Sequence, residues 1–172
     1  MRLLLASLLV ILSASGNSAL AQQATLSVVT PDKADAQAYR TLFRRALSYK
    51  KLADEADLAH TPKPHLRHVL ATRYALSDDD SASLEKMAIA YQVAIKPIHD
   101  RTLEVVKQYR ARFPFGVIQA GMDATPPPEL AELQKQDDAV TLLYRDLLHN
   151  SMREENFQKL NTRIAADFGG RL

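Results

Sequence analysis

Three histidines that lie close together are the residues of this chain best suited to bind a metal. They are His60, His65 and His68, and the last two are one helical turn apart. Neutral imidazoles at this spacing can share a Zn, Ni or Cu ion if a third ligand is available. No HExxH motif, cysteine or fixed carboxylate accompanies them. Two interpretations follow, a metal site formed by these three histidines or a polar face exposed to solvent.

Adjacent carboxylates occur at residues 78–80, 137–138 and 154–155, and paired carboxylates can act as general acid and base. The first and last of these groups fall where helices are expected to begin, and acids there stabilise the helix dipole without a catalytic role. The chain also has no Gly-x-Ser-x-Gly motif, and its five glycines form no phosphate-binding loop. The sequence therefore predicts no catalytic residue, no cofactor and no enzymatic activity.

The first 21 residues have the three-part pattern of a secretory signal peptide. Arg2 is followed by an apolar run at residues 3–12 and then by small residues that end at Ala21. The alternative, an uncleaved membrane anchor, would need roughly 20 apolar residues to span a bilayer. We therefore expect cleavage after Ala21, a single helical domain at residues 22–172, and a periplasmic or secreted protein without stable membrane insertion.

The composition of the remaining chain excludes several classes of protein. Arg2 is the only charged residue before Asp32, so the chain after cleavage carries 21 basic and 20 acidic side chains. This near-neutral balance argues against a protein that binds nucleic acid or a membrane surface. The absence of cysteine excludes disulfides, thiol nucleophiles and thiolate metal ligands, so the fold must be stabilised by packing.

Residues 77–113 are expected to form one long helix around which the fold is organised. Apolar side chains recur along it in steps of mostly three, four and seven residues, as in an amphipathic helix. These side chains are Leu84, Met87, Ala88, Tyr91, Ile95, Ile98, Val105, Val106, Tyr109 and Phe113. Pro97 removes a backbone hydrogen bond inside this helix, so a kink is expected. We expect Tyr91, Ile98 and Val106 to be buried against the first and fourth helices.

Four further helices are expected near residues 31–59, 64–74, 126–149 and 151–168. Thr-Pro pairs at residues 30–31, 61–62 and 125–126 predict three of the helix starts. Capping boxes that begin at Ser77 and Ser151 predict the other two. Because no segment alternates as a strand does, the fold class is predicted as all-α. The predicted architecture is an antiparallel helical bundle or helical hairpin of four to five helices, with a long kinked central helix.

An apolar stretch without helical periodicity follows the long helix. Its apolar side chains are Phe113, Phe115, Val117, Ile118 and Met122, and Pro114 and Gly116 prevent the helix from continuing. So many large apolar side chains need a cover. Either this segment folds back over the open end of the bundle, which we favour, or it forms a contact surface for a protein partner or client.

Two stretches of the chain resemble copies of the LTxxQ motif, which marks small secreted helical proteins of the Spy/CpxP type. The first runs from Leu76 to Asp80 and is followed by Leu84 and Ala88; the second runs from Met152 to Asn156 and is followed by Leu160 and Ile164. Ser77 and Arg153 replace the motif's Thr, and Asp80 and Asn156 replace its Gln. The resemblance implies an all-helical hairpin in the periplasm, often a curved homodimer, among chaperones, envelope-stress regulators and heavy-metal-resistance or sensor proteins.

These observations give one leading hypothesis for function and two alternatives. The leading one is a secreted or periplasmic helical binding module, a chaperone-like or envelope-stress adaptor without catalytic activity, whose partner is a protein or an unfolded client. It could act as a homodimer. The first alternative is a periplasmic metal-binding sensor or resistance protein that uses His60, His65 and His68. The second is a structural helical bundle associated with the cell envelope.

Overall fold

The structure of the protein is a computed structural model that describes residues 31–113 and 124–168. Within these ranges it contains five helices and no strand: α1 (Pro31–Leu58), α2 (His65–Tyr74), α3 (Asp78–Arg110), α4 (Pro128–Ser151) and α5 (Glu154–Phe168). The prediction of an all-α bundle with a long central helix is confirmed. No helix in the described part of the chain is both long enough and apolar enough to cross a membrane.

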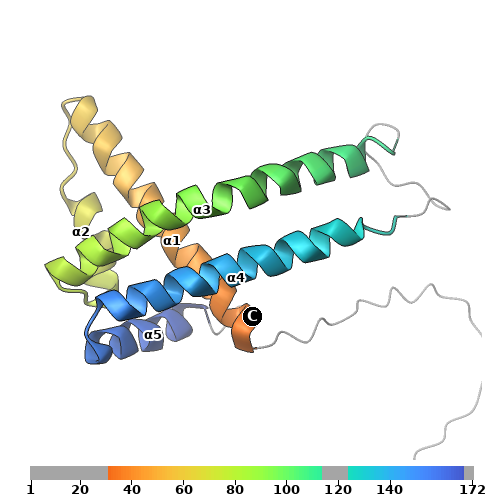
Figure 1. Cartoon of the computed structure of the whole chain (residues 1–172). Coiled ribbons are helices and arrows are strands. Elements are labelled where there is room, and N and C mark those ends of the chain that lie inside the picture. The colour runs from red at the N-terminus through yellow and green to blue at the C-terminus, as the bar shows by residue number, and fades with distance from the viewer. Residues whose placement is uncertain (1–30, 114–123, 169–172) are drawn as a thin grey trace, which may run out of the picture.

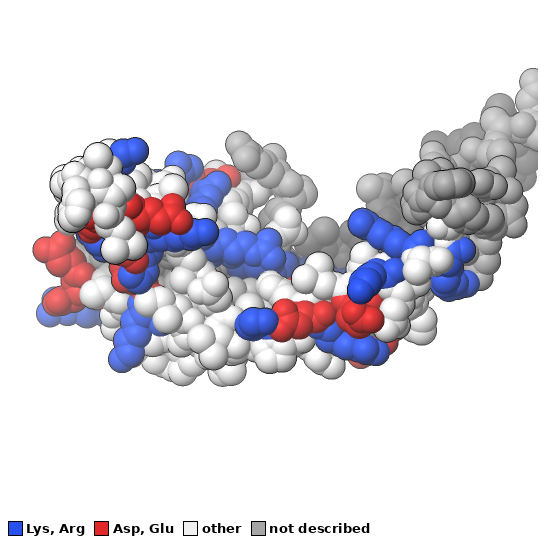
Figure 2. Space-filling model, turned by 90° about the horizontal axis from the view of Figure 1, so that it is seen from above, with Lys and Arg blue, Asp and Glu red and all other residues white. Residues whose placement is uncertain are grey.

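The longest helices, α3 and α4, lie side by side in antiparallel directions and share the most extensive contact in the molecule (Figure 1). Helix α1 crosses both of them at a steep angle. The short helices α2 and α5 lie at the end of this hairpin where α3 begins and α4 ends. At the other end, α3 and α4 extend beyond α1, and Figure 2 shows several Lys and Arg side chains near this free end of the hairpin.

The core lies where α1 crosses the hairpin. Tyr39 and Phe43 of α1 are buried, and the Phe43 ring lies 5.0 Å from that of Tyr91 on α3. Helix α5 closes the core from below, where Phe157 stacks on Tyr39 with 6.4 Å between ring centroids. The Tyr39 hydroxyl also donates a hydrogen bond to the side chain of Asn161. Aromatic side chains therefore join three helices that are far apart in the sequence.

The buried face of α3 differs from the prediction in its second half. Tyr91 is buried as expected, but Ile98 is only half-buried, and Val105 is buried where Val106 was predicted to be. The cause is the position of α1, which crosses only the first part of α3 (Figure 1). Farther along, α4 is the only helix of the described residues that lies beside α3, so the buried face of α3 turns toward that helix. Helix α3 also runs through Pro97 without interruption, and the kink stays a prediction.

The helix ends confirm some capping predictions and contradict others. Helix α1 begins at Pro31, and the Ser77 hydroxyl caps α3 by accepting a hydrogen bond from the Asp80 backbone N–H at 3.1 Å, both as predicted. The Thr-Pro pairs at residues 61–62 and 125–126 do not begin helices. Helices α2 and α4 start only at His65 and Pro128. The residue before a proline is disfavoured in helical geometry, so each helix starts at or just after the last proline of its cluster.

The capping box predicted at Ser151 is also wrong. Ser151 is the last residue of α4, and its hydroxyl donates a hydrogen bond to the Leu148 carbonyl at 2.8 Å. Helix α5 begins at Glu154. The Arg153 carbonyl accepts the N–H groups of Asn156 and Phe157, each at 3.0 Å, so Arg153 occupies the position that precedes the helix. A serine hydroxyl near a helix boundary can donate to a carbonyl of the preceding helix or accept an N–H of the following one, and the sequence does not distinguish the two.

Candidate functional site

A concave surface lies between α1 and α3. It consists of two adjoining cavities that are open to solvent, of about 770 and 380 Å³. Three residues line both cavities and mark the place where they meet: Arg44, Leu47 and Gln92. We call the two cavities together the α1–α3 groove. It exists because α1 crosses α3 steeply, so that the two helices separate on either side of the crossing (Figure 1).

The larger cavity presents uncovered apolar surface. Leu58 on α1 is 81% exposed, and Ile89 on α3 is 41% exposed. Leu47 lines the same cavity and is half-buried. Single exposed apolar residues are ordinary, but apolar side chains that line a concave surface together are typical of binding grooves. The shape and composition of the groove therefore suit a ligand with apolar side chains.

The rim of the groove is charged, and most of its charges are paired. Four Lys or Arg side chains and three Asp or Glu side chains line the two cavities, and His99 lines the smaller one in addition. Three of the cations form ion pairs with these acids: Lys50–Asp54 at 2.7 Å, Lys51–Glu55 at 3.7 Å and Lys96–Asp100 at 2.5 Å. The fourth is Arg44, which is exposed and makes no hydrogen bond or ion pair with the residues that the structure describes. One uncompensated positive charge therefore lies where the cavities meet.

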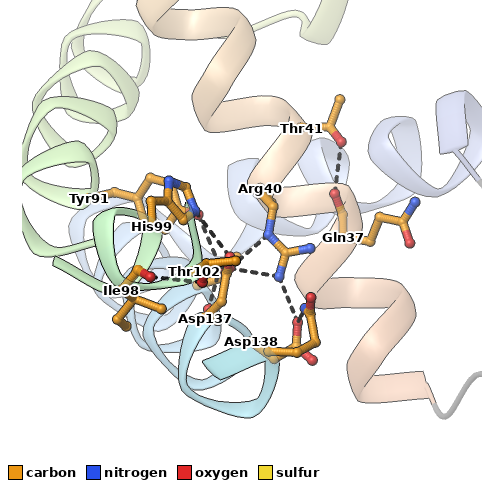
Figure 3. A network of polar contacts seen from close by, with 11 residues as sticks. Gln37, Arg40, Thr41, Tyr91, Ile98, His99, Thr102, Asp137 and Asp138 are labelled. Atoms are coloured by element: carbon orange, nitrogen blue, oxygen red, sulfur yellow. Dashed lines mark hydrogen bonds and ion pairs between the residues drawn. The ribbon is translucent and has the colours of Figure 1, made fainter. Parts of the chain in front are cut away.

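A buried polar network fixes the helices below the smaller cavity (Figure 3). Arg40 of α1 donates from Nε to Asp137 Oδ1 at 2.8 Å and from Nη2 to Asp138 Oδ1 at 2.6 Å. His99 Nε2 lies 3.1 Å from the other oxygen of Asp137. Burial lowers the pKa of Arg40, but the hydrogen bond with Asp138 and the charge of Asp137 outweigh this effect and hold the pKa above its usual range. The guanidinium is therefore permanently charged and joins α1 to α4.

The same network orients two side chains of the smaller cavity, His99 and Tyr91. The Tyr91 hydroxyl lies 3.2 Å from Thr141 Oγ1, and Thr141 donates to the Asp137 carbonyl at 2.8 Å. Burial raises the pKa of Tyr91, so its hydroxyl stays protonated at neutral pH. Each of these polar groups already has a partner within the network. The network therefore links side chains of the smaller cavity to α1 and α4.

Sequence reasoning missed this network, although one signal for it was present. Asp137 lies four residues after Leu133 and four before Thr141, and all three are buried on one face of α4. A carboxylate on the apolar stripe of a helix needs a cationic partner, because an unpaired buried charge is costly. The sequence did not indicate that the partner would be Arg40, which comes from a different helix.

The structure does not bring the three predicted metal-ligating histidines together as a metal site. His60, His65 and His68 are all exposed; His60 lies in the turn after α1, and the other two lie on α2. Across residues 31–113 and 124–168, no group of three or more His, Asp or Glu side chains could hold a metal ion.

Of the predicted partner-contact residues, only Phe113 is described. It is buried, and its ring packs edge-on against Tyr109 with 5.1 Å between centroids. The other four, Phe115, Val117, Ile118 and Met122, lie outside the described residues.

The two stretches that resemble the LTxxQ motif meet at one end of the bundle. Asp80, at the end of the first stretch, accepts a hydrogen bond from the Asn156 side-chain amide at 2.8 Å, and Asn156 ends the second stretch. The Ser77 hydroxyl donates to the same Asp80 oxygen at 2.7 Å. The two residues that stand where the motif has Gln, Asp80 and Asn156, therefore bond to one another, and they join the start of α3 to the start of α5.

Comparison with protein families, with curated proteins and with solved structures finds no match to this chain.

Proposed function

We propose that this protein is a secreted or periplasmic binding module that holds unfolded polypeptide in the α1–α3 groove, as a chaperone does, without catalytic activity. The observation that carries the proposal is the apolar lining of an open groove, formed by Leu47, Leu58 and Ile89. Unfolded chains expose apolar side chains, and burying these against the groove would be favourable by about 25 cal/mol for each Å² removed from water.

The form of the groove suits a polypeptide better than a small molecule. Small-molecule sites bury most of their ligand in a largely apolar cleft with a few convergent polar groups, whereas this groove is open to solvent and extends along two helices. Its walls are two continuous helices, α1 and α3, held by the Arg40 network. An open groove of mixed apolar and charged character can accept many sequences, because it makes few demands on the geometry of any one client.

Two features of the sequence support the same proposal. The pattern of residues 1–21 indicates export, and a chaperone for exported proteins would act outside the cytoplasm. The second feature is the resemblance to the LTxxQ motif. The hydrogen bond between Asp80 and Asn156 is consistent with a paired motif, because it brings the two stretches together at one end of the bundle.

An aggregation assay tests the proposal. The purified chain is added to a chemically unfolded client, and light scattering is recorded as the client is diluted out of denaturant. We expect wild-type protein to reduce the scattering and Ile89→Ser to be clearly less effective, since Ile89 lines the groove. The matched control is Leu143→Ser, because Leu143 is a similarly exposed apolar residue on α4 that does not line the groove.

Two outcomes would contradict the proposal. If wild-type protein leaves aggregation unchanged, a structural bundle of the cell envelope becomes the better explanation. If both variants lose activity equally, suppression does not depend on the groove.

Mass spectrometry of the exported protein tests its location separately. We expect a chain that starts at Gln22, and a chain that retains residues 1–21 would argue against cleavage.

A further inference from the structure

The charge of the groove distinguishes among the polypeptides it could hold. Every cation in its lining has an acidic partner within the groove except Arg44, which is exposed at the junction of the two cavities. An occupant that brings a carboxylate to this position completes the pairing. An occupant that brings a cation adds a second positive charge beside the first, which is unfavourable.

We propose that the α1–α3 groove prefers client segments in which Asp or Glu lies beside large apolar residues, and that Arg44 is the side chain that recognises the acid. This inference rests on the proposed function, since it names the class of polypeptide that the same groove binds. The occupant is thus an acidic and apolar peptide segment rather than a basic one.

The positions of the lining residues fit this class of segment. Arg44 and Leu47 are one turn apart on α1, and Ile89 and Gln92 are one turn apart on α3, so each wall includes a polar and an apolar side chain that are neighbours on the helix surface. A bound segment can therefore place a carboxylate at Arg44 while its neighbouring apolar side chains contact Leu47 and Ile89. The planar guanidinium of arginine can bind both oxygens of a carboxylate at once, which a lysine ammonium cannot do with the same geometry.

The cations beside Arg44 are less suited to this role. Lys50 donates to Asp54 at 2.7 Å, and Arg67 of α2 also donates to Asp54 at 2.9 Å. The hydrogen bonds from Lys50 and Arg67 hold the pKa of Asp54 below its usual range, so this carboxylate stays ionised and keeps its partners. A client acid would have to compete with an internal acid at Lys50, whereas it meets no competitor at Arg44.

Fluorescence anisotropy with labelled peptides tests the inference. The probes are three peptides of equal length and identical apolar residues that carry two Asp, two Asn or two Lys at their centre. Wild-type protein should bind the Asp peptide about fivefold more tightly than the Lys peptide, which is the effect of one well-placed exposed ion pair. The variant Arg44→Glu should invert this order, and a purely structural role of Arg44 would not produce an inversion.

The control is Lys33→Glu, which makes the same change of charge on the same helix at an exposed residue outside the groove. It should keep the wild-type order of the peptides. Equal binding of the Asp and Lys peptides by wild-type protein would overturn the inference but leave the polypeptide-binding function intact. Inversion by both variants would also overturn it, since net charge would then explain the preference. If no peptide binds and aggregation is not suppressed, the proposed function itself fails.

Discussion

Arg40 illustrates how much a single side chain can determine in this molecule. Its guanidinium and the carboxylates of Asp137 and Asp138 are between 12 and 17% exposed, so the three charges lie largely out of water. Removing charges from water is costly, and only close pairing compensates for it. The network therefore depends on Arg40, because without its guanidinium Asp137 and Asp138 would stay largely out of water and lose their closest cation.

The first prediction concerns this residue. The variant Arg40→Ala should lower the free energy of unfolding by about 3 kcal/mol, because it removes the guanidinium that pairs with two largely buried carboxylates. Urea unfolding followed by circular dichroism measures the loss. The matched control is Arg101→Ala, which breaks an equally close ion pair with Glu129 at 2.6 Å on the exposed side of the hairpin. Its loss should be much smaller. Equal losses would show that burial does not set the strength of the Arg40 network.

The second prediction concerns Asp167 near the end of α5. Its carboxylate accepts hydrogen bonds from Arg73 Nε at 2.7 Å, from Arg73 Nη2 at 2.9 Å and from the Tyr74 hydroxyl at 3.0 Å. The hydrogen bond from Arg73 holds the pKa of Asp167 below its usual range in the folded protein. A lowered pKa adds stability above the unfolded value of about 4, and this contribution is lost as the pH falls toward the folded value.

Wild-type protein should therefore be more stable than Asp167→Asn between pH 5 and 7, and the difference should shrink below about pH 4. Thermal melts at a series of pH values measure it, and comparing the two proteins at each pH cancels the effect of the other carboxylates. A difference that stays constant down to pH 2.5 would mean that Asp167 contributes through packing rather than charge.

At the scale of helices, periodicity predicted the elements well and their ends less well. All five helices were expected, because an apolar repeat extends over many residues and can be recognised even where single residues depart from it. Helix ends depend on one or two residues, and the proline clusters before α2 and α4 moved the starts past the threonines. The α1–α3 groove was not predicted, because it arises from the crossing angle of two helices that no local pattern encodes. The position of Arg44 at this groove was not foreseen either.

The third prediction tests the buried face of α3. The variant Val105→Ala should lower the free energy of unfolding by about 1 to 2 kcal/mol, since it removes buried methyl groups, and Val106→Ala should cost less. The two changes are chemically identical and one residue apart, so denaturant unfolding of the pair reports orientation alone. The opposite order would restore the assignment made from the sequence, with Val106 toward the core.

At the scale of the whole molecule, the last helix completes a core that the first helix begins. Phe157, Leu160 and Ile164 of α5 are buried in the same cluster as Tyr39 and Leu42 of α1. Helix α5 has limited contact with α4, its neighbour in sequence, and packs chiefly on α1 and α2. The stability of the beginning of the domain therefore depends on its end.

The fourth prediction follows from this arrangement. A chain that ends at Arg153 and so lacks α5 should keep much of its helix content but lose cooperative unfolding, because the aromatic cluster at Tyr39 is then open to water. Far-ultraviolet circular dichroism measures the first property and thermal denaturation the second. A chain that ends at Phe168 serves as the control and should unfold like the full chain. Cooperative unfolding of the shorter chain would show that α5 is dispensable.

The bond between Tyr39 and Asn161 spans 122 positions of the sequence, and this separation has a consequence for the order of events during synthesis. Contacts between distant residues form late, because the intervening chain must first be closed into a loop. A ribosome adds about 5 to 20 residues each second, so the apolar face of α1 waits several seconds for α5 to emerge. Throughout that interval the nascent chain lacks the packing of α5, so the side of Tyr39 that Phe157 covers stays open to water.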